Sequence, residues 1–389
     1  MNILITALSS STGPSGICRH AYSLVCCAAS RREISEVTLV IGKWQEEYFR
    51  HSFRIEGAKV NIIVIDTRND AFTRNCWYLW ELPKLLDAVA ADILHLSFPV
   101  PIRRNALNCP VVVSLHDLYP YDEPHNFGFP KVFFNRVFLQ RCLEEADLVA
   151  CVSETTLSRL TTRFPQIAQR KSVVVHNCVN INSDRPSAPV IQGQPFFLMV
   201  AQHRANKNIS LALRAFGSLL EKGRIERGTL LVILGNHGPE TAAIKAVIER
   251  EVLEDRVKMM DSVSDEELSW LYKSCDLLLA PSLTEGFGLP VVEGLLCGSR
   301  VVCSDIPTFR EIGGEACHYF DLNAGKDVSA LAAVICDALE TPRRISENLD
   351  RFSLGEIANK LMVVYVDLRE GSMQAAKRNE TVALHPAGS

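Results

Sequence analysis

The chain has 389 residues, enough for two or three domains of ordinary size. Apolar residues make up 47% and charged residues 22%, which excludes a disordered or collagen-like chain. Lysine and arginine number 41 against 45 acidic residues, so the formal net charge is −4, and no nucleic-acid partner is expected from this balance.

The first half of the chain alternates short apolar runs with helical patterns. The runs are nearly continuous in Val, Ile and Leu, as expected for parallel strands covered on both faces. Strands are predicted at residues 2–8, 37–41, 60–65, 93–98, 111–115, 148–152 and 172–176, and helices at 17–30, 75–90, 130–146 and 154–163. This alternation predicts a doubly wound α/β domain over residues 1–185.

The same alternation restarts after a linker at 182–194, which is rich in Pro, Ser and Gly. Strands are predicted at 196–201, 229–234, 257–260, 277–281, 300–303 and 317–320, and helices at 208–221, 239–251, 265–274 and 290–297. A second domain of the same class is expected at 195–345. Two such domains in tandem create an interdomain cleft lined by strand carboxyl ends, where ligands of these folds bind.

The C-terminal part of the chain changes character twice. Residues 354–367 have the pattern of a helix, which we expect to cross back to the first domain. Residues 371–389 are polar without a periodic pattern, and we expect a disordered tail there.

The most specific motif is APSLTEGFGLPVVE at residues 280–293, which follows a predicted strand and leads into a helix. Gly286 and Gly288 let a ligand approach the backbone, and the helix N-terminus favours an anion. Glu285 lies on the loop and Glu293 about one turn into the helix, so both carboxylates are expected to face one pocket. A carboxylate suits the hydroxyl groups of a sugar or a ribose. The alternative is a structural role, in which one glutamate caps the helix and the other is exposed beside a glycine turn.

A second motif contains Arg204 and Lys207, directly after the strand predicted at 196–201. An arginine fork and a lysine point charge at the end of a strand suit a diphosphate. The alternative is a solvated loop that carries two cations. The neighbouring glutamate motif favours the diphosphate interpretation.

Two more candidate positions lie in the first domain. His116 and Asp117 end the strand at 111–115, where they either meet a sugar hydroxyl or the reacting centre, or only mark a turn. The turn from Gly13 to Gly16 either receives phosphate or sugar oxygens or is a tight connection between strand and helix. It is not a dinucleotide fingerprint, because Gly-x-x-Gly stands in place of Gly-x-Gly-x-x-Gly. The chain also lacks the P-loop and the Gly-x-Ser-x-Gly elbow, which disfavours phosphoryl transfer and ester hydrolysis.

The glutamate motif resembles the Glu-x7-Glu signature of retaining glycosyltransferase family 4, whose fold is GT-B, with two tandem Rossmann-like domains and an interdomain cleft. The resemblance covers nearly the whole chain. Residues 13–22 resemble the family's glycine-rich acceptor-side loop, residues 116–117 its His-Asp pair and residues 174–177 the strand before the linker. Residues 257–265 resemble the strand, turn and helix beside the nucleotide base.

The resemblance implies four catalytic residues. Glu285 binds the hydroxyls of the transferred sugar, and His116 contacts the sugar near the reacting carbon. Lys207 holds the diphosphate. The family often has an arginine at the position of Gln202, so we expect Arg204 to take that part by a different path.

The resemblance also implies a set of substrate-binding positions. Glu293 takes the ribose, and backbone N–H groups at the start of the following helix hold the sugar and the diphosphate. The other positions in this set are Gly16, Asp117, Gly286, Phe287, Gly288, Leu289 and Val263.

The implied reaction is transfer of a hexose from a nucleoside-diphosphate sugar to a glycan or polyprenyl-linked acceptor in cell-surface polysaccharide biosynthesis, with GDP-mannose favoured as donor. Two alternatives stay open: a nucleotide-sugar epimerase of the same fold and a non-catalytic nucleotide-sugar-binding protein. The nucleotide sugar is a substrate, so no cofactor is expected. No metal site is expected either, because the sequence has no cluster of metal ligands.

The expected location is the cytoplasm. Thirteen cysteines are scattered without a Cys-x-x-Cys pair, which suits a reducing compartment. The opening residues lack the features of a signal peptide, and no apolar run is long enough to span a membrane. Local basic residues of the first domain, among them Arg103 and Arg104, predict weak peripheral contact with the inner face of the plasma membrane.

Overall fold

The computed structural model divides the chain into two compact units. The first unit contains residues 1–178 and 351–389, and the second contains residues 179–350. The described residues are 1–13, 15–51, 53, 57–122, 131–181, 191, 193–322, 328–343 and 348–383, with the side chains of 131 and 372–383 not included. Pro14, Arg54 and most of the expected linker at 182–194 lie outside the described residues.

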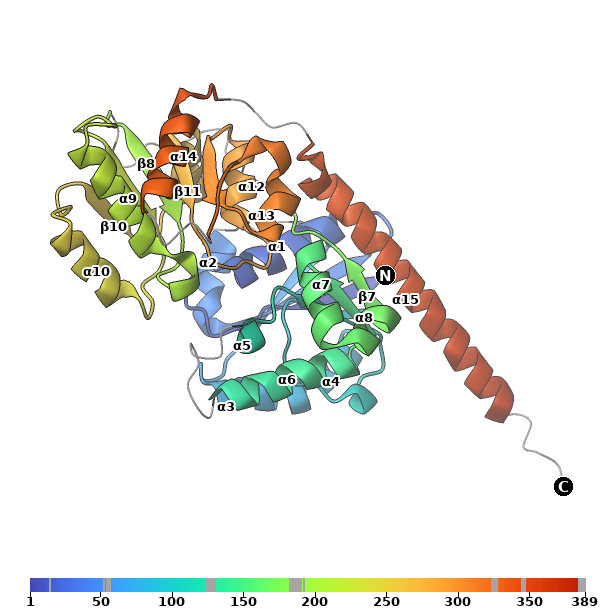
Figure 1. The fold of residues 1–389 in the computed structure, drawn as a ribbon. Coiled ribbons are helices and arrows are strands. Elements are labelled where there is room, and N and C mark those ends of the chain that lie inside the picture. The colour runs from blue at the N-terminus through green and yellow to red at the C-terminus, as the bar shows by residue number, and fades with distance from the viewer. Residues whose placement is uncertain are drawn as a thin grey trace. The chain divides into compact units, whose positions relative to one another are not determined.

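A seven-stranded parallel sheet forms the centre of the first unit (Figure 1). Its strands are β1 (Asn2–Thr6), β2 (Glu36–Gly42), β3 (Val60–Ile65), β4 (Ile93–Leu96), β5 (Val111–Leu115), β6 (Leu148–Cys151) and β7 (Ser172–Val174). Their order is β3-β2-β1-β4-β5-β6-β7, which is the order of a Rossmann fold with one added strand. Most of these strands are buried along their length, because helices cover both faces of the sheet.

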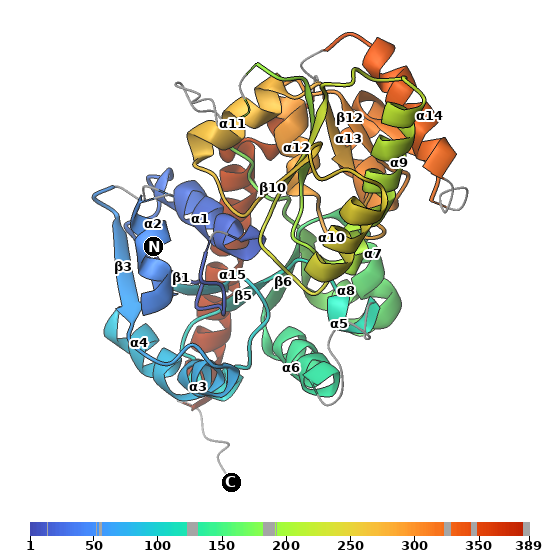
Figure 2. The ribbon, with the colours of Figure 1, turned by 90° about the vertical axis from the view of Figure 1, so that its left-hand side faces the viewer.

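Two groups of helices cover the two faces of this sheet. One face packs against α1 (Gly16–Ala29), α2 (Glu46–His51) and α15 (Leu354–Ala383). The other packs against a π-helical segment (Trp77–Glu81), α4 (Leu82–Ala88), α6 (Lys131–Glu145), α7 (Glu154–Arg163) and α8 (Pro165–Lys171). The short helix α3 (Ala71–Cys76) leads into the π-helical segment. A short helix, α5 (Tyr119–Asp122), follows β5. Figure 2 shows α3, α4 and α6 near one end of this unit, in agreement with Figure 1.

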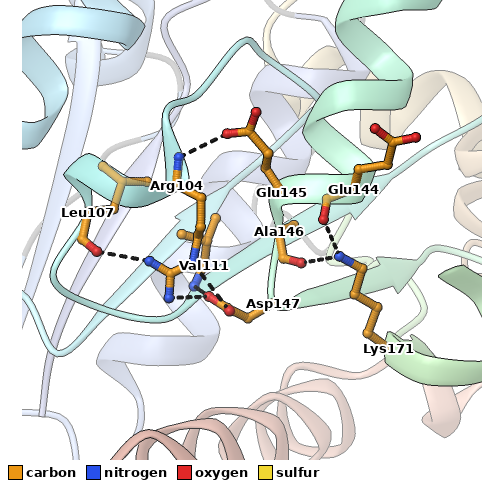
Figure 3. Close-up of polar contacts among 8 residues, drawn as sticks. All are labelled: Arg104, Leu107, Val111, Glu144, Glu145, Ala146, Asp147 and Lys171. Carbon is orange, nitrogen blue, oxygen red and sulfur yellow. Dashed lines mark hydrogen bonds and ion pairs between the residues drawn. The ribbon is translucent and has the colours of Figure 1, made fainter. Parts of the chain in front are cut away.

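A polar network fixes the connections around β5 and β6 (Figure 3). Asp147, just before β6, accepts from the guanidinium of Arg104 at 3.0 Å and from the amide of Val111 at 2.8 Å. Lys171 Nζ donates a hydrogen bond of 2.6 Å to the carbonyl of Ala146, directly after α6, and so connects α8 to the end of α6. Arg104, which the sequence suggested for membrane contact, is therefore already paired within its own unit.

A six-stranded parallel sheet forms the centre of the second unit. Its strands are β8 (Phe196–Val200), β9 (Leu230–Leu234), β10 (Val257–Met260), β11 (Leu277–Ala280), β12 (Val301–Ser304) and β13 (His318–Phe320), in the order β10-β9-β8-β11-β12-β13. Its helices are α9 (Ile209–Glu221), α10 (Thr241–Arg250), α11 (Asp265–Ser274), α12 (Leu289–Leu296), α13 (Pro307–Gly313) and α14 (Val328–Glu340). The expectation of two Rossmann-like α/β domains is confirmed.

A glycine lets α12 lie unusually close to this sheet. A Cβ atom added at Gly294 would be 2.5 Å from Leu278 Cδ2 on β11, which no real side chain tolerates. The helices α9, α10 and α14 pack on the opposite face of the sheet. The close approach fixes the start of α12 at the carboxyl edge of β11.

The C-terminal helix is longer than the sequence predicts. We expect a helix at 354–367 and disorder from 371, whereas α15 continues to Ala383. Residues 371–383 contain many helix formers and no proline, and they extend a helix that already exists, so no new nucleation is needed. Packing anchors the first half of this helix, since Ile357, Leu361 and Tyr365 are fully buried against the first unit. Residues 384–389 lie outside the described residues.

Candidate active site

Two loops meet at the carboxyl edge of the sheet in the second unit. β8 and β11 are neighbours, and the strand order reverses between them, which is where Rossmann-like sheets bind ligands. The amide of Leu283 donates to the carbonyl of Asn206 at 2.7 Å, and the side-chain amide of Asn206 donates to the carbonyl of Thr284 at 3.4 Å. The strand order thus brings the two predicted motifs of this unit into contact.

A lysine–glutamate pair forms the centre of this site. Lys207 Nζ lies 2.5 Å from Glu285 Oε1, and Ser282 Oγ donates to the same oxygen at 2.7 Å. Thr308 Oγ1 donates to the backbone carbonyl of Glu285 at 2.9 Å, which fixes the loop. The Lys207 and Glu285 side chains are 20% and 13% exposed, so the pair is partly shielded yet still reachable from solvent. Lys207, Ser282 and Glu285 share one small pocket with Gly288 and Pro290 at the start of α12.

The start of α12 depends on Gly288. This residue is the N-cap and has φ +95°, a left-handed conformation that side chains other than glycine disfavour. A Cβ atom there would also lie 2.7 Å from the ring of Phe309. Phe287 is buried, Gly286 and Leu289 are half-buried, and the N-terminus of α12 faces the pocket with the positive end of its dipole.

The second glutamate of the motif lies in a different environment. Glu293 is only 6% exposed, and its Oε2 accepts a hydrogen bond of 2.6 Å from the hydroxyl of Tyr272 on α11. The small pocket is lined by Glu285 and does not include Glu293. Among the described residues, Glu285 lines the small pocket and Glu293 does not, so the structure places the two carboxylates in different environments.

Two other candidates of the second unit lie at the same edge of the sheet. Arg204 is exposed and precedes the short 3-10 helix Ala205–Lys207, outside the lining of the small pocket. Val263 is half-buried on the loop between β10 and α11. Lys207 and Glu285 thus contact each other, and the amide of Lys207 also donates to the carbonyl of Arg204 at 3.0 Å. Val263 lies on a separate loop.

In the first unit, His116 lies just after β5. Its Nε2 is 2.8 Å from the carbonyl oxygen of Ser97, which follows the neighbouring strand β4. A carbonyl only accepts, so Nε2 carries the hydrogen and Nδ1 keeps the lone pair. The hydroxyl of Thr156, at the start of α7, donates to the His116 carbonyl at 3.2 Å. Burial lowers the pKa of His116, so its ring is neutral at pH 7.

The other two candidates of the first unit have local structural settings. Asp117 Oδ1 accepts from the amide of Tyr119 at 3.0 Å, a bond that closes the turn into α5. Gly16 is the first residue of α1, after the N-cap Ser15. A Cβ atom added at Gly16 would contact nothing within 4 Å, so sterics alone do not require a glycine there.

Comparisons with known proteins assign the chain to a family. The family model described as Glycosyltransferase Family 4 matches residues 14–183, and the model described as Glycosyl transferases group 1 matches residues 180–353. The O-antigen biosynthesis glycosyltransferase WclY of Escherichia coli is 33% identical over 292 residues, which cover 71% of this chain and 79% of that protein. The chain belongs to glycosyltransferase family 4.

Other relatives extend this result. The O-antigen chain mannosyltransferase B of Escherichia coli is 29% identical over 237 residues, which cover 59% of this glycosyltransferase and 61% of that protein. The sucrose-phosphate synthase structure from Thermosynechococcus elongatus superposes with a TM-score of 0.71 at 16% identity, over 95% of this chain and all of the other. At that identity the likeness shows the fold alone, and the expected GT-B fold is confirmed.

The glycosyltransferase also has a buried histidine cluster behind His116, which the sequence analysis missed. The ring of His20 on α1 meets the ring of His116 edge to face at 4.6 Å. Ser114 Oγ lies 2.8 Å from His20 Nε2 and 2.9 Å from His95 Nε2, and His95 Nδ1 lies 2.6 Å from the hydroxyl of Tyr365. Burial, together with the neighbouring histidine charges, lowers the pKa of His20 and lowers that of His95 to about 3.

The described part of the glycosyltransferase shows neither a cluster of metal ligands nor a membrane-spanning helix. Among the described residues, no group of three or more His, Cys, Asp or Glu side chains is arranged to hold a metal ion. In the same part of the chain, no helix has the length and apolar character needed to cross a membrane.

Proposed function

We propose that this glycosyltransferase moves a hexose from a nucleoside-diphosphate sugar to a glycan or polyprenyl-linked acceptor, with retention of the anomeric configuration. The observation that carries the proposal is the group of Lys207, Glu285 and Ser282 in one pocket with the start of α12. The group combines a cation for the diphosphate with a carboxylate for the sugar hydroxyls.

The proposed source of rate acceleration is stabilisation of the leaving group. As the bond between the anomeric carbon and the diphosphate breaks, negative charge grows on the diphosphate. Lys207 supplies a full positive charge, and the N-terminus of α12 supplies the equivalent of about half a charge. Donors that are in position before the reaction are worth on the order of 10²–10³ in rate each. We propose that these charges suffice without a divalent cation.

The environments of the two glutamates favour sugar transfer over glycoside hydrolysis. Glycosidases use an acid and a second carboxylate on opposite sides of the scissile bond. Here Glu285 lines the pocket, whereas Glu293 is buried beside Tyr272. We therefore assign both to binding: Glu285 to the sugar hydroxyls and Glu293, through its Oε1, to the ribose.

His116 is proposed to contact the transferred sugar near its reacting carbon, as the family resemblance implies. Because Nε2 donates its hydrogen bond to the carbonyl of Ser97, Nδ1 is the ring atom that accepts a hydrogen bond from a sugar hydroxyl. A neutral ring is required for this, and burial favours the neutral form at pH 7.

The names of the relatives support the proposed setting. Two of them are the O-antigen proteins WclY and mannosyltransferase B, and the second name specifies mannose. We propose cell-surface polysaccharide biosynthesis as the process, GDP-mannose as the donor and the cytoplasmic face of the plasma membrane as the location.

We also propose peripheral membrane contact through the first unit. Phe72, Trp80, Phe133 and Phe134 are 77%, 56%, 58% and 51% exposed. Phe72 belongs to α3, and the others belong to the π-helical segment and α6, which cover the same face of the sheet. The guanidinium of Arg103 lies 4.2 Å from the centre of the Trp80 ring. Aromatic rings beside a cation suit the interface of an anionic membrane.

The proposal is tested by donor binding and turnover. A thermal-shift screen compares GDP-mannose with UDP, ADP and dTDP sugars, and a donor at about 100 times its Kd stabilises the protein by about 2.7 kcal/mol. Turnover is then measured in EDTA with an oligosaccharide acceptor for the wild type, Lys207→Ala and Lys222→Ala. Lys222 is exposed at the end of α9 and serves as the matched control.

We expect Lys207→Ala to lose a factor on the order of 10²–10³ in turnover and Lys222→Ala to keep the wild-type rate. Equal rates in both variants would overturn the diphosphate assignment. Release of free nucleotide and an epimerised sugar without acceptor would replace the transferase proposal by an epimerase. Binding of a donor without any turnover would indicate a nucleotide-sugar-binding protein.

A further inference from the structure

A separate pocket lies in the first unit. None of the residues assigned to the candidate active site lines it. It has a volume of about 370 Å³, within the range of small-molecule sites, and lies between α5, α6 and α7. Its polar lining residues are Tyr121, Asp122, Arg136, Ser158, Arg159, Thr162 and Arg163. Three guanidinium groups against one carboxylate give the described lining an excess of positive charge.

We propose that this pocket binds the phosphoryl groups of the acceptor, and specifically a diphosphate. This inference rests on the proposed function, since it assigns the chemistry of the acceptor in that reaction. The donor's own diphosphate is assigned to Lys207 in the second unit, so the pocket is a separate anion site.

Within the described part of the chain, one of the three arginines has a carboxylate partner and two do not. Arg159 pairs with Asp122, with Nη1 3.6 Å from Oδ2. Among the residues that the structure describes, Arg136 and Arg163 have no carboxylate partner. Arg136 Nε donates to the carbonyl of Pro120 at 2.8 Å, which holds the side chain in place and leaves the two terminal nitrogens for a ligand.

The two arginines are held close together by one aromatic ring. The guanidinium carbons of Arg136 and Arg163 lie 5.0 Å and 4.7 Å from the centre of the Tyr121 ring. They are therefore within about 10 Å of each other, and their like charges repel. A multiply charged anion between them removes this repulsion, whereas a neutral ligand does not.

The available donors match a diphosphate. Guanidinium groups form paired, parallel hydrogen bonds with phosphate oxygens, and the hydroxyl of Ser158 adds a further donor. The presence of Arg163 also has a structural explanation. It is the last residue of α7, where a positive charge interacts favourably with the helix dipole. That explanation does not apply to Arg136, which lies in the first half of α6.

The position of the pocket links it to the proposed reacting centre. Leu118 lines the pocket and lies two residues beyond His116 on the same loop. The hydroxyl of Thr156 at the start of α7 donates to the carbonyl of His116, so the wall of the pocket and the catalytic loop are tied together. The pocket is thus built on the same loop and helix that hold His116.

The test measures anion binding with the donor site disabled. In a Lys207→Ala background, isothermal titration with inorganic pyrophosphate and with farnesyl diphosphate is compared between the intact pocket and Arg136→Gln/Arg163→Gln. Arg141→Gln/Arg170→Gln is the matched control, because both residues are exposed and neither lines the pocket.

We expect the pocket variant to bind both probes roughly tenfold or more weakly and the control variant to bind them as the Lys207→Ala parent does. Tighter binding of farnesyl diphosphate than of pyrophosphate identifies the source as a lipid-linked diphosphate. Equal affinities assign the pocket to the phosphoryl groups alone. Unchanged affinity in the pocket variant, or no binding by the parent, overturns the inference.

Donor turnover separates failure of this inference from failure of the proposed function. If the wild-type protein transfers hexose while the pocket variant keeps its pyrophosphate affinity, only the acceptor site is refuted. If the wild type shows no donor turnover while the arginines bind pyrophosphate, the pocket stands and the transferase reaction is refuted.

Discussion

Acidification should destabilise the first unit in part through one buried histidine, His95. His95 is fully buried on β4, with its two ring nitrogens bonded to Tyr365 and Ser114. Burial lowers its pKa to about 3, and the charge of His116 acts in the same direction. The folded unit therefore keeps this ring neutral at pH values where the unfolded chain takes up a proton.

The size of the effect follows from the two pKa values. An unfolded histidine has a pKa of about 6.5, so as the pH falls from 6.5 toward 3 the unfolded state binds one proton that the folded state does not. Each pH unit in this window removes about 1.36 kcal/mol of stability. At pH 5, protonation of His95 in the unfolded chain alone costs the folded state about 2 kcal/mol.

The measurement needs a signal from the first unit only. Of the four tryptophans, only Trp270 belongs to the second unit, so a Trp270→Phe background limits tryptophan fluorescence to the first. Urea unfolding at pH 7 and pH 5 is then compared for His95→Gln and His51→Gln, the second being an exposed histidine on α2.

We expect the background protein and the His51→Gln control to lose the same amount of stability between pH 7 and pH 5. His95→Gln should lose about 2 kcal/mol less, although it starts from a lower stability at pH 7. The effect of carboxylate protonation on stability is the same in all three proteins, so it cancels in the comparison. An identical loss in all three proteins would show that His95 is protonated in the folded state and would refute the reasoning.

Three further outcomes are expected. Glu285→Gln should mainly lower kcat, because its contacts tighten as the sugar becomes cation-like, whereas Glu293→Gln should mainly raise the donor KM; steady-state kinetics with equal effects on both constants would contradict this division. Gly288→Ala should lower the melting temperature by roughly 4 °C or more, because alanine disfavours φ +95° and its Cβ would collide with the Phe309 ring. The control is Gly228→Ala, because a Cβ atom there has no neighbour within 4 Å. Phe133→Ser/Phe134→Ser should reduce co-sedimentation with anionic vesicles at low salt, and unchanged binding would remove these side chains from the proposed membrane contact.

The strands and the loops that follow them are predictable from the sequence. Buried parallel strands need apolar residues on both faces, so the run at 111–115 coincides with β5. Polar motifs directly after such runs indicate Lys207 and Glu285 as candidates. Their contact is not predictable from local patterns, because it requires β8 and β11 to be neighbours, and that depends on the order of strands in the sheet.

The partners of buried polar groups are the part that the sequence does not reveal. Tyr272 lies on the buried side of α11 and has the pattern of an ordinary core residue. Only the packing of α11 against α12 brings its hydroxyl to Glu293, 21 positions away. In the same way, His95 sits in an apolar strand, and its partner Tyr365 is 270 residues away on the C-terminal helix. Such long-range pairs leave no periodic signal.

The ion pair at the candidate active site bears on how a donor would bind. Lys207 contacts Glu285, so in this arrangement the cation proposed for the diphosphate also positions the carboxylate proposed for the sugar. A diphosphate carries more charge than a carboxylate and competes for the lysine, while Ser282 continues to hold Glu285 Oε1. On the proposed function, binding of the diphosphate therefore releases part of the hydrogen-bonding capacity of Glu285 for the sugar hydroxyls. The two roles are coupled through one lysine, and Lys207→Ala would remove both the leaving-group charge and the contact that positions Glu285.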